Sequence, residues 1–194
     1  MRKAEISRKT KETEVFVSLN IDGCGKYKIS TGIHFLNHML ELFSKHSLVD
    51  LEIQAKGDLN VDFHHTVEDV GIVLGQAVSK ALDDRKGIFR FGDAIVPMDE
   101  ALTLVSLDLS NRGVCVCDIK ESKEKVGDFD SELVVEFFRA FAVNAGLTLH
   151  IKTLSGSNMH HIFESSFKAL AISFRKASAF DPLNKDIPSV KGLL

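Results

Sequence analysis

The chain has 194 residues, 44% of them hydrophobic, which suffices for the core of one large domain or two small fused halves and excludes disordered and collagen-like proteins. Its 27 acidic and 24 basic residues give a net charge of -3, which argues against a nucleic-acid partner. No apolar run reaches the ~18 residues of a membrane helix and the opening residues lack a signal peptide, so we expect a soluble, cytoplasmic protein with no membrane partner.

The first half of the sequence alternates between strand and helix patterns. Apolar residues at every second position predict strands, and apolar residues at helical spacing predict helices. In chain order we expect a hairpin through 15–30 with its turn at 23–25, a helix at about 34–46, a strand at 48–55 and a long helix at about 64–82. Basic residues and Gly87 follow that helix and predict its end.

The second half shows the same order of elements. We expect strands at 91–96, 101–109 and 113–119, a helix at 131–144, a strand at 147–153 and a helix at about 160–179. Both halves therefore predict three strands, a helix, a strand and a helix. The expected fold is α+β, with duplicated half-domains that each form a mostly antiparallel four-stranded sheet with two helices on one face.

This pattern divides the chain without separating it into independent domains. We expect one domain over 1–194, with a first pseudo-repeat at 1–88, a second at 89–181 and a C-terminal tail at 182–194. No low-complexity linker separates the repeats, so they should pack as one unit.

Two histidine doublets support the duplication. His64-His65-x-x-Glu68 recurs as His160-His161-x-x-Glu164, 96 residues later. The helix that carries His38 matches the helix that carries Glu136 at an offset of 98, as do the strands at 51–53 and 149–151. A loop two residues shorter in the second half would explain the change of offset.

The doublets also predict a two-metal site. Neighbouring residues on a helix point about 100° apart, whereas positions four apart share a face, so His64 can point with Glu68 while His65 points elsewhere. One such motif is weak evidence, but its recurrence in a duplicated fold favours metal ligands over surface or core histidines. The predicted ligands are His38, His64, His65, Glu68, Glu136, His160, His161 and Glu164.

The types of ligand limit the possible metal ions to a few but do not select one. Imidazole and carboxylate donors without thiolate suit Mn²⁺, Fe²⁺, Co²⁺, Ni²⁺ or Zn²⁺, and eight ligands on two ions would leave octahedral positions open for substrate or water. The three cysteines, Cys24, Cys115 and Cys117, form neither a disulfide set nor a C-x-x-C pair and are expected to be buried or inert thiols. The other histidines suit half-buried faces outside the site.

Six motifs carry a family resemblance that covers essentially the whole chain. They are TGIHFLNHML at 31–40, DFHHTVED at 62–69, RFGD at 90–93, MDEAL at 98–102, GxNxHHxxE at 156–164 and PSVKG at 188–192. In these motifs the chain closely resembles the imidazoleglycerol-phosphate dehydratases of histidine biosynthesis. The resemblance implies two Mn²⁺ ions per subunit, bound between subunits, and self-association into a hollow 24-subunit shell.

The resemblance also implies a reaction and roles for residues. The family enzyme is a hydro-lyase that removes water from D-erythro-1-(imidazol-4-yl)glycerol 3-phosphate and yields imidazole acetol phosphate. We expect Glu164 to be a ligand that also handles protons, because a carboxylate at the edge of a metal can accept one as the coordination changes. By family position, Glu12 would reach the hydroxyls of the substrate. The phosphate would be bound by Arg90, Arg112, Lys168, Ser189, Val190 and Lys191, the last three in a substrate-binding tail.

Three positions depart from the family pattern. Asn37 replaces the usual aspartate before His38, Glu136 stands where some relatives carry histidine, and Val190 stands where a hydroxyl residue is common. We expect altered orientation of His38, a changed charge around one ion and one phosphate donor fewer.

Two other classes of protein fit the same residues. A metal-dependent hydrolase would turn over phosphate esters or amides that lack an imidazole ring. A metal-storing shell would take up many ions without substrate specificity.

Overall fold

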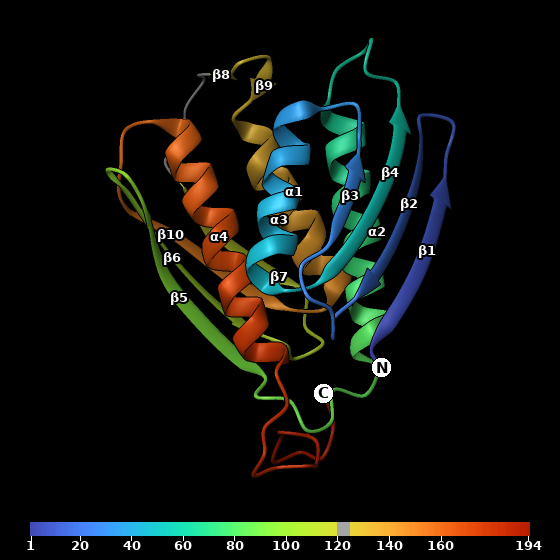
Figure 1. Ribbon diagram of the computed structural model, residues 1–194, viewed down its shortest axis with the longest axis vertical. Helices are drawn as coiled ribbons and strands as arrows, with labels where there is room; N and C mark the ends of the chain where they lie inside the picture. The colour runs from blue at the N-terminus through green and yellow to red at the C-terminus, as the bar shows by residue number, and fades with distance from the viewer. Residues whose placement is uncertain (120–124) are drawn as a thin grey trace.

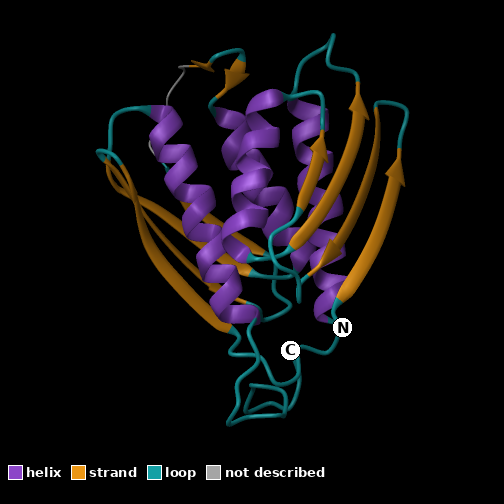
Figure 2. Ribbon diagram, in the orientation of Figure 1, coloured by secondary structure: helices purple, strands orange, loops and turns teal. Residues whose placement is uncertain are grey.

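Four helices lie side by side between two four-stranded sheets (Figures 1 and 2). The computed structural model describes residues 1–119 and 125–194. The first half comprises β1 (Lys3–Lys9), β2 (Thr13–Asn20), β3 (Tyr27–Ser30), α1 (His34–Ser47), β4 (Asp50–Gly57) and α2 (His64–Leu82). The second comprises β5 (Phe91–Met98), β6 (Ala101–Asp108), β7 (Val114–Asp118), β8 (Lys125–Val126), β9 (Phe129–Asp130), α3 (Glu132–Ala145), β10 (Thr148–Ser155) and α4 (Met159–Ser178).

The two sheets have the same topology, which confirms the predicted duplicated α+β fold. Their strand orders are β1-β2-β4-β3 and β5-β6-β10-β7. In each sheet the last strand runs parallel to its neighbour and the other pairs are antiparallel. The predicted order of three strands, helix, strand and helix is present in both halves. The sequence pattern does not locate β1, which precedes the predicted hairpin, or β8 and β9 in the second half.

The strand register shows where the two halves differ in length. Leu19 pairs with Leu51 in the first sheet, and Leu107 pairs with Leu149 at the equivalent place in the second. Leu107 follows Leu19 by 88 residues, whereas Leu149 follows Leu51 by 98. The second half therefore has ten extra residues between its second and fourth strands, where β8 and β9 lie. The predicted shorter loop is also present, because 58–63 connect β4 to α2 whereas only 156–158 connect β10 to α4.

The hairpin predicted through 15–30 is wrong. β2 pairs with β1 and β4, and β3 pairs in parallel with β4 instead of folding back on β2. The reason is a long-range contact: the backbone N–H groups of Cys24 and Lys26 both donate to Asp50 Oδ1, each at 2.9 Å, which ties the turn to the start of β4.

The predicted glycine stop of α2 is also wrong. The helix ends at Leu82, and Asp83 itself takes a positive φ of 50°. The basic residue that follows serves another helix: buried Arg85 donates from Nη2 to the carbonyl of Ala145 at 2.9 Å, at the last residue of α3. A cation there faces the negative end of the α3 dipole.

Aromatic packing joins the helices of the two halves. Phe138 on α3 and Phe167 on α4 have ring centroids 4.7 Å apart, and Phe43 on α1 contacts Phe141 and Phe174. All these rings are buried. Because they fill the space between the helices, they fix α1 against α4. None of the helices in the described part of the chain is long and apolar enough to cross a membrane.

The thiols meet the sequence expectation in part. Cys115 and Cys117 face the core from β7, and burial raises their pKa to about 11 and about 12. The expectation of a buried thiol is wrong for Cys24, which is exposed in the turn before β3. We therefore expect iodoacetamide at pH 8 to alkylate only Cys24 in the folded protein, because thiolates are the reactive species.

Mass spectrometry of the intact chain measures this outcome as one added group. The same reagent in denaturant is the control and should add three groups, one for each cysteine. Rapid labelling of Cys115 in the folded protein would contradict the assignment.

Two glycines let α2 approach α3 closely. A Cβ at Gly75 would lie 2.7 Å from the carbonyl oxygen of Phe141 and 2.8 Å from the nitrogen of Ala145. A Cβ at Gly71 would lie 3.0 Å from the carbonyl oxygen of Phe137. The backbone atoms of α3 cannot yield as a flexible side chain would, so both positions require glycine.

We expect Gly75→Ala to destabilise the protein by about 1–3 kcal/mol through overpacking. In an exposed helix the same change would stabilise by about 1 kcal/mol, so the sign of the effect is the test. The midpoint of thermal unfolding measures it, and Lys80→Ala, at an exposed position of the same helix, should leave that midpoint nearly unchanged. A higher midpoint for Gly75→Ala would refute the close approach.

Candidate metal centre and substrate site

Three predicted ligands from both halves of the chain converge at one place. His38 on α1 has its Nε2 3.8 Å from Oε2 of Glu164 on α4, and His160 has its Nε2 3.3 Å from the same oxygen. In the part of the chain that the structure describes, this is the one group of three or more histidine, cysteine or acidic side chains whose ligand atoms lie within 4.8 Å of one another. We call His38, His160 and Glu164 the triad.

Local structure fixes the two helix starts that carry the triad. The side chain of Asn158 accepts the backbone N–H of His160 and caps α4. On α1, Phe35 lies one turn before His38, and its ring packs edge-on against His160 at 5.4 Å between centroids. Since His160 and Glu164 are four residues apart, they share one face of α4.

Lys168 completes the surroundings of the triad. Its Nζ lies 2.5 Å from Oε1 of Glu164, so one carboxylate oxygen faces lysine and the other faces the two imidazoles. Burial by itself would raise the pKa of Glu164, but the hydrogen bond and charge of Lys168, helped by the two histidines, lower it below the ordinary value. Glu164 is therefore an ionised carboxylate, as metal binding requires.

The donor set fits a divalent metal ion. Imidazole nitrogens and a carboxylate oxygen, without thiolate, are ligands for Mn²⁺ and its neighbours in the first transition row. The side chains of His38 and His160 are 45% and 41% exposed, whereas that of Glu164 is 10% exposed. The triad is therefore open on its imidazole side, where further ligands or substrate could bind.

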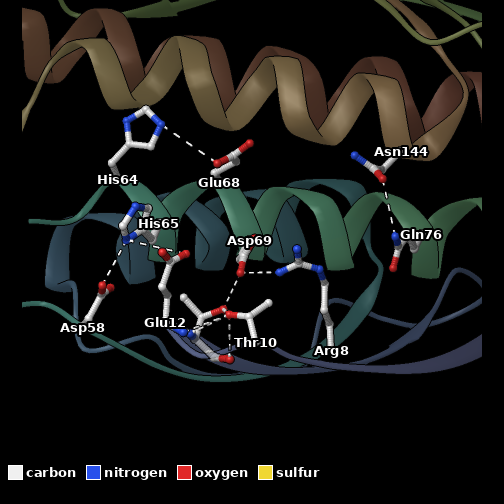
Figure 3. Close-up of polar contacts among 11 residues, drawn as sticks. Arg8, Thr10, Glu12, Asp58, His64, His65, Glu68, Asp69, Gln76 and Asn144 are labelled. Carbon is white, nitrogen blue, oxygen red and sulfur yellow. Dashed lines mark hydrogen bonds and ion pairs between the residues drawn. The ribbon is translucent and has the colours of Figure 1, made fainter.

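The histidines of each doublet point in different directions, as the helical geometry predicted. The rings of His64 and His65 are 6.4 Å apart and inclined at 85°, and those of His160 and His161 are 6.1 Å apart and inclined at 84°. Figure 3 shows His64 projecting from α2 on the side of Glu68, while His65 projects on the opposite side. The nearest atoms of His64 and Glu68 are 4.0 Å apart.

The second histidine of each doublet contacts a carboxylate. Nδ1 of His65 lies 3.0 Å from Oδ2 of Asp58 and 4.0 Å from Oε2 of Glu12 (Figure 3). Nδ1 of His161 lies 2.7 Å from Oε2 of Glu100, and its Nε2 lies 3.7 Å from Asp99. The hydrogen bond that His65 donates to Asp58 is the main cause that raises the pKa of His65, and the bond that His161 donates to Glu100 does the same for His161.

Asp69 fixes α2 on the first sheet. Its buried carboxylate accepts hydrogen bonds from Arg8 on β1 and Thr13 on β2 (Figure 3). It lies on the helix next to Glu68, so the same turn that carries the ligand candidates is held to the sheet.

The equivalent of the triad in the first half is not assembled. Its members would be His64, Glu68 and Glu136, the counterpart of His38. Glu136 instead pairs with Arg139, with 2.6 Å between Oε2 and Nη1. The structure thus brings three of the eight predicted ligands together, leaves His64 beside Glu68 on α2, and, among the residues it describes, places no other predicted ligand in a group of three.

Five of the six predicted phosphate-binding residues share a cavity of about 740 Å³ at the base of the second half: Arg90, Arg112, Ser189, Val190 and Lys191. Arg90 binds Asp108 through Nε at 2.7 Å and also donates from Nη1 to the carbonyl of Pro188 at 2.8 Å, which draws the tail against the sheet. Lys168, the sixth, does not line this cavity, because it pairs with Glu164.

Two departures from the family pattern have a structural account. Oδ1 of Asn37 accepts the backbone N–H and the hydroxyl of Thr31, at 3.0 and 2.7 Å, so this side chain braces the start of α1 rather than the ring of His38. The side chain of Val190 is fully exposed at the edge of the cavity, and the hydroxyl of Ser189 accepts the N–H of Lys191.

Sequence reasoning missed Asp58 and Glu100 as partners of the doublets. Asp58 lies in a loop that carried no motif of its own. Glu100 lies in the MDEAL motif, but nothing in its spacing relates a turn between two strands to the start of a helix 60 residues later. The signal that could have found Glu100 is its place 88 residues after Glu12, which is the strand offset of the repeat.

Comparisons with known proteins agree with this architecture. Residues 31–174 match the family model described as imidazoleglycerol-phosphate dehydratase. Proteins of that name from Thermoanaerobacter pseudethanolicus and Caldanaerobacter subterraneus subsp. tengcongensis are 57% and 58% identical to this chain, in each case over 194 residues and 100% of both chains.

Solved structures show the same fold. The crystal structure of imidazoleglycerol-phosphate dehydratase from Staphylococcus aureus is 41% identical, with a TM-score of 0.84 over 92% of this chain and 99% of that one. The enzyme from Pyrococcus furiosus, crystallised in complex with (S)-C348, is 39% identical, with a TM-score of 0.84 over 97% of this chain and 100% of that one.

Lys168→Met tests the electrostatics of the triad. Removal of the lysine leaves the buried Glu164 without its main partner, so we expect the metal-free protein to lose about 3 kcal/mol of stability at pH 7. The lowered pKa of Glu164 means that its ionised form stabilises the fold above the ordinary carboxyl pKa and loses this effect as the pH falls. The loss should therefore shrink at pH 4, where the carboxyl of the variant takes a proton.

Thermal unfolding of the metal-free protein at both pH values measures this difference. Lys176→Met, on an exposed part of the same helix, serves as the control and should show little change at either pH. An equal loss for Lys168→Met at pH 4 and pH 7 would contradict the charge argument.

Proposed function

The chain belongs to the imidazoleglycerol-phosphate dehydratase family, and we propose that it catalyses the family's elimination of water at a pair of metal ions held by both halves of its fold. Members of this family are hydro-lyases of histidine biosynthesis, and the substrate is a phosphorylated imidazole. Full-length identity of 56–58% to several enzymes of this name sets aside a general hydrolase or a storage shell.

The observation that carries the proposal is the triad. His38 comes from the first half of the chain, and His160 and Glu164 come from the second. The three side chains converge although His160 follows His38 by 122 positions in the sequence. Core packing alone gives no reason for two half-exposed imidazoles to face one buried carboxylate. A metal ion does, since it binds all three groups at once.

We assign the eight predicted ligands to two Mn²⁺ ions per subunit: His38, His64, His65, Glu68, Glu136, His160, His161 and Glu164. In one chain His65 and His161 are turned away from their neighbours His64 and His160, with ring planes inclined at 85° and 84°. Because the eight side chains do not converge on two sites within one chain, we infer that a neighbouring copy completes each site, in a 24-subunit shell. Glu136 would replace its bond to Arg139 with a bond to the metal when that site is complete.

The chemistry requires one group that handles protons and others that orient the substrate. When bound, the two cations supply Lewis-acid stabilisation of negative charge on the imidazole ring. Glu164 would accept the proton from the carbon next to the one that loses hydroxide, since Lys168 keeps its carboxylate ionised. Glu12, at 4.0 Å from His65 and exposed, would hold the hydroxyls of the substrate.

The phosphate would occupy the cavity formed by the C-terminal tail at 182–194. Arg90 is already anchored by Asp108 and Pro188, so it contributes a fixed guanidinium. Arg112 and Lys191 are exposed and can close on the anion, with Ser189 and the backbone of Val190 as further donors. Lys168 would reach the phosphate only through a change of partner, because it is bound to Glu164.

The deciding experiment is turnover of imidazole glycerol phosphate by Mn²⁺-loaded and by chelator-stripped protein. We expect the product ketone to appear with the loaded protein and to be strongly reduced after stripping. A phosphate ester without an imidazole ring should give no product. Absence of ketone in both preparations would remove the proposed mechanism.

Variants of His65 and His161, the second histidine of each doublet, test the ligand assignment. His65→Ala and His161→Ala should lower both bound Mn²⁺ and the rate, whereas His150→Ala, exposed on the outer face of β10, should change neither. Normal metal content in both of the first two variants would contradict the ligand assignment. Light scattering of the active protein should show a large assembly rather than a monomer.

A further inference from the structure

Glu100 makes three contacts that fix the role of each of its oxygens. It lies in the turn between β5 and β6, next to the start of α4. Oε1 accepts the backbone N–H groups of Ser157 and Asn158, at 3.3 and 2.9 Å. Oε2 faces Nδ1 of His161 at 2.7 Å. The carboxylate is therefore held by the loop before α4 and presents its free oxygen to one particular ring nitrogen.

This arrangement selects one form of the imidazole. A carboxylate oxygen only accepts hydrogen bonds, so Nδ1 of His161 must carry a proton. In the neutral ring Nε2 then has the lone pair, and that atom is the one available to a metal ion. Nε2 lies on the other edge of the ring, 3.7 Å from Oδ2 of Asp99.

The first half performs the same task with a different residue. Asp58, in the loop between β4 and α2, binds Nδ1 of His65. The counterpart of Glu100 in that half is Glu12, 88 residues earlier, whose carboxylate is 4.0 Å away from the same nitrogen. In the second half the loop at 156–158 is shorter and contains no acidic residue, so the turn carboxylate makes the contact instead.

We propose that Glu100 is a positioning residue for the metal site: it holds His161 in the form with the proton on Nδ1 and Nε2 free, while its first-half counterpart Glu12 stays available for the substrate. This inference rests on the proposed function, in which His161 is a ligand. It predicts that a substitution at Glu100 changes which nitrogen of His161 carries the proton, and that this change alters the affinity for the metal.

Glu100→Gln is the sharpest test because its amide has one defined orientation. Two backbone N–H groups face Oε1, so the amide oxygen has to take that place and the NH₂ group has to face His161. The NH₂ donates to Nδ1 and drives the proton to Nε2, which removes the ligand atom. Glu100→Ala lacks this group and leaves the ring free to take either form.

The measurement is the dissociation constant for Mn²⁺, determined by titration of the assembled, metal-free protein. We expect Glu100→Gln to raise it on the order of 10–100-fold, and Glu100→Ala to raise it less. The thermal unfolding midpoint without metal should fall more for the alanine variant, since only that variant loses the contacts to Ser157 and Asn158.

Asp58→Asn is the matched control. Oδ1 of Asp58 is buried without a hydrogen-bond partner among the described residues, so no donor prevents the amide from turning its oxygen toward His65. We expect its effect on the Mn²⁺ dissociation constant to be smaller than that of Glu100→Gln. Glu52→Gln, on the outer face of the first sheet, should have no effect.

The opposite order of variants would overturn the proposal. If Glu100 served only to hold the loop, the glutamine variant would bind Mn²⁺ nearly as well as the original protein and the alanine variant would bind worse. His161→Ala distinguishes a failure of the proposed function, because unchanged Mn²⁺ binding in that variant would show that His161 is not a ligand and would overturn both.

Discussion

The packing of α1 against α4 is the constraint on which the site depends. These helices belong to different halves of the chain, and buried aromatic rings from α1, α3 and α4 fill the space between them. A metal ligand set tolerates errors of only a few tenths of an ångström, and a close-packed interior of this kind resists such displacement. The position of His38 relative to His160 and Glu164 is therefore set by apolar contacts farther along the two helices, such as that between Phe43 and Phe174, rather than by the ligands themselves.

Duplication produced two similar half-sites that no longer have the same chemistry. Glu164 has a lysine one turn later, whereas the position equivalent to Lys168 in the first half is Ile72. The carboxylate of Glu68 is 41% exposed, while that of Glu164 is buried and pairs with Lys168. A lysine that neutralises a buried carboxylate keeps it ionised without occupying both oxygens, so Glu164 stays an anionic ligand candidate although it is buried.

The helices and the geometry of the histidine doublets can be predicted from the sequence because they depend on residues that are close together in the chain. The α2 helix and the divergence of His64 from His65 follow from helical spacing alone. The pairing of β3 with β4 does not follow from local spacing, because it depends on Asp50, which lies more than 20 residues from the turn that it anchors. The other five predicted ligands do not converge within one chain, because their places depend on loops and contacts that no periodicity in the sequence encodes.

The two turn carboxylates show how a repeat can gain a second role without a new residue. In the first half two acidic groups surround His65, and Asp58 is the nearer at 3.0 Å, so Glu12 is spared from orienting the ring. In the second half the shorter loop before α4 removes the alternative, and Glu100 is committed by three hydrogen bonds. A site built from both kinds of half needs one carboxylate free for the substrate, not two. A difference in loop length is thus sufficient to give two equivalent residues different roles: Glu12 is left free for the substrate, and Glu100 orients a histidine ring.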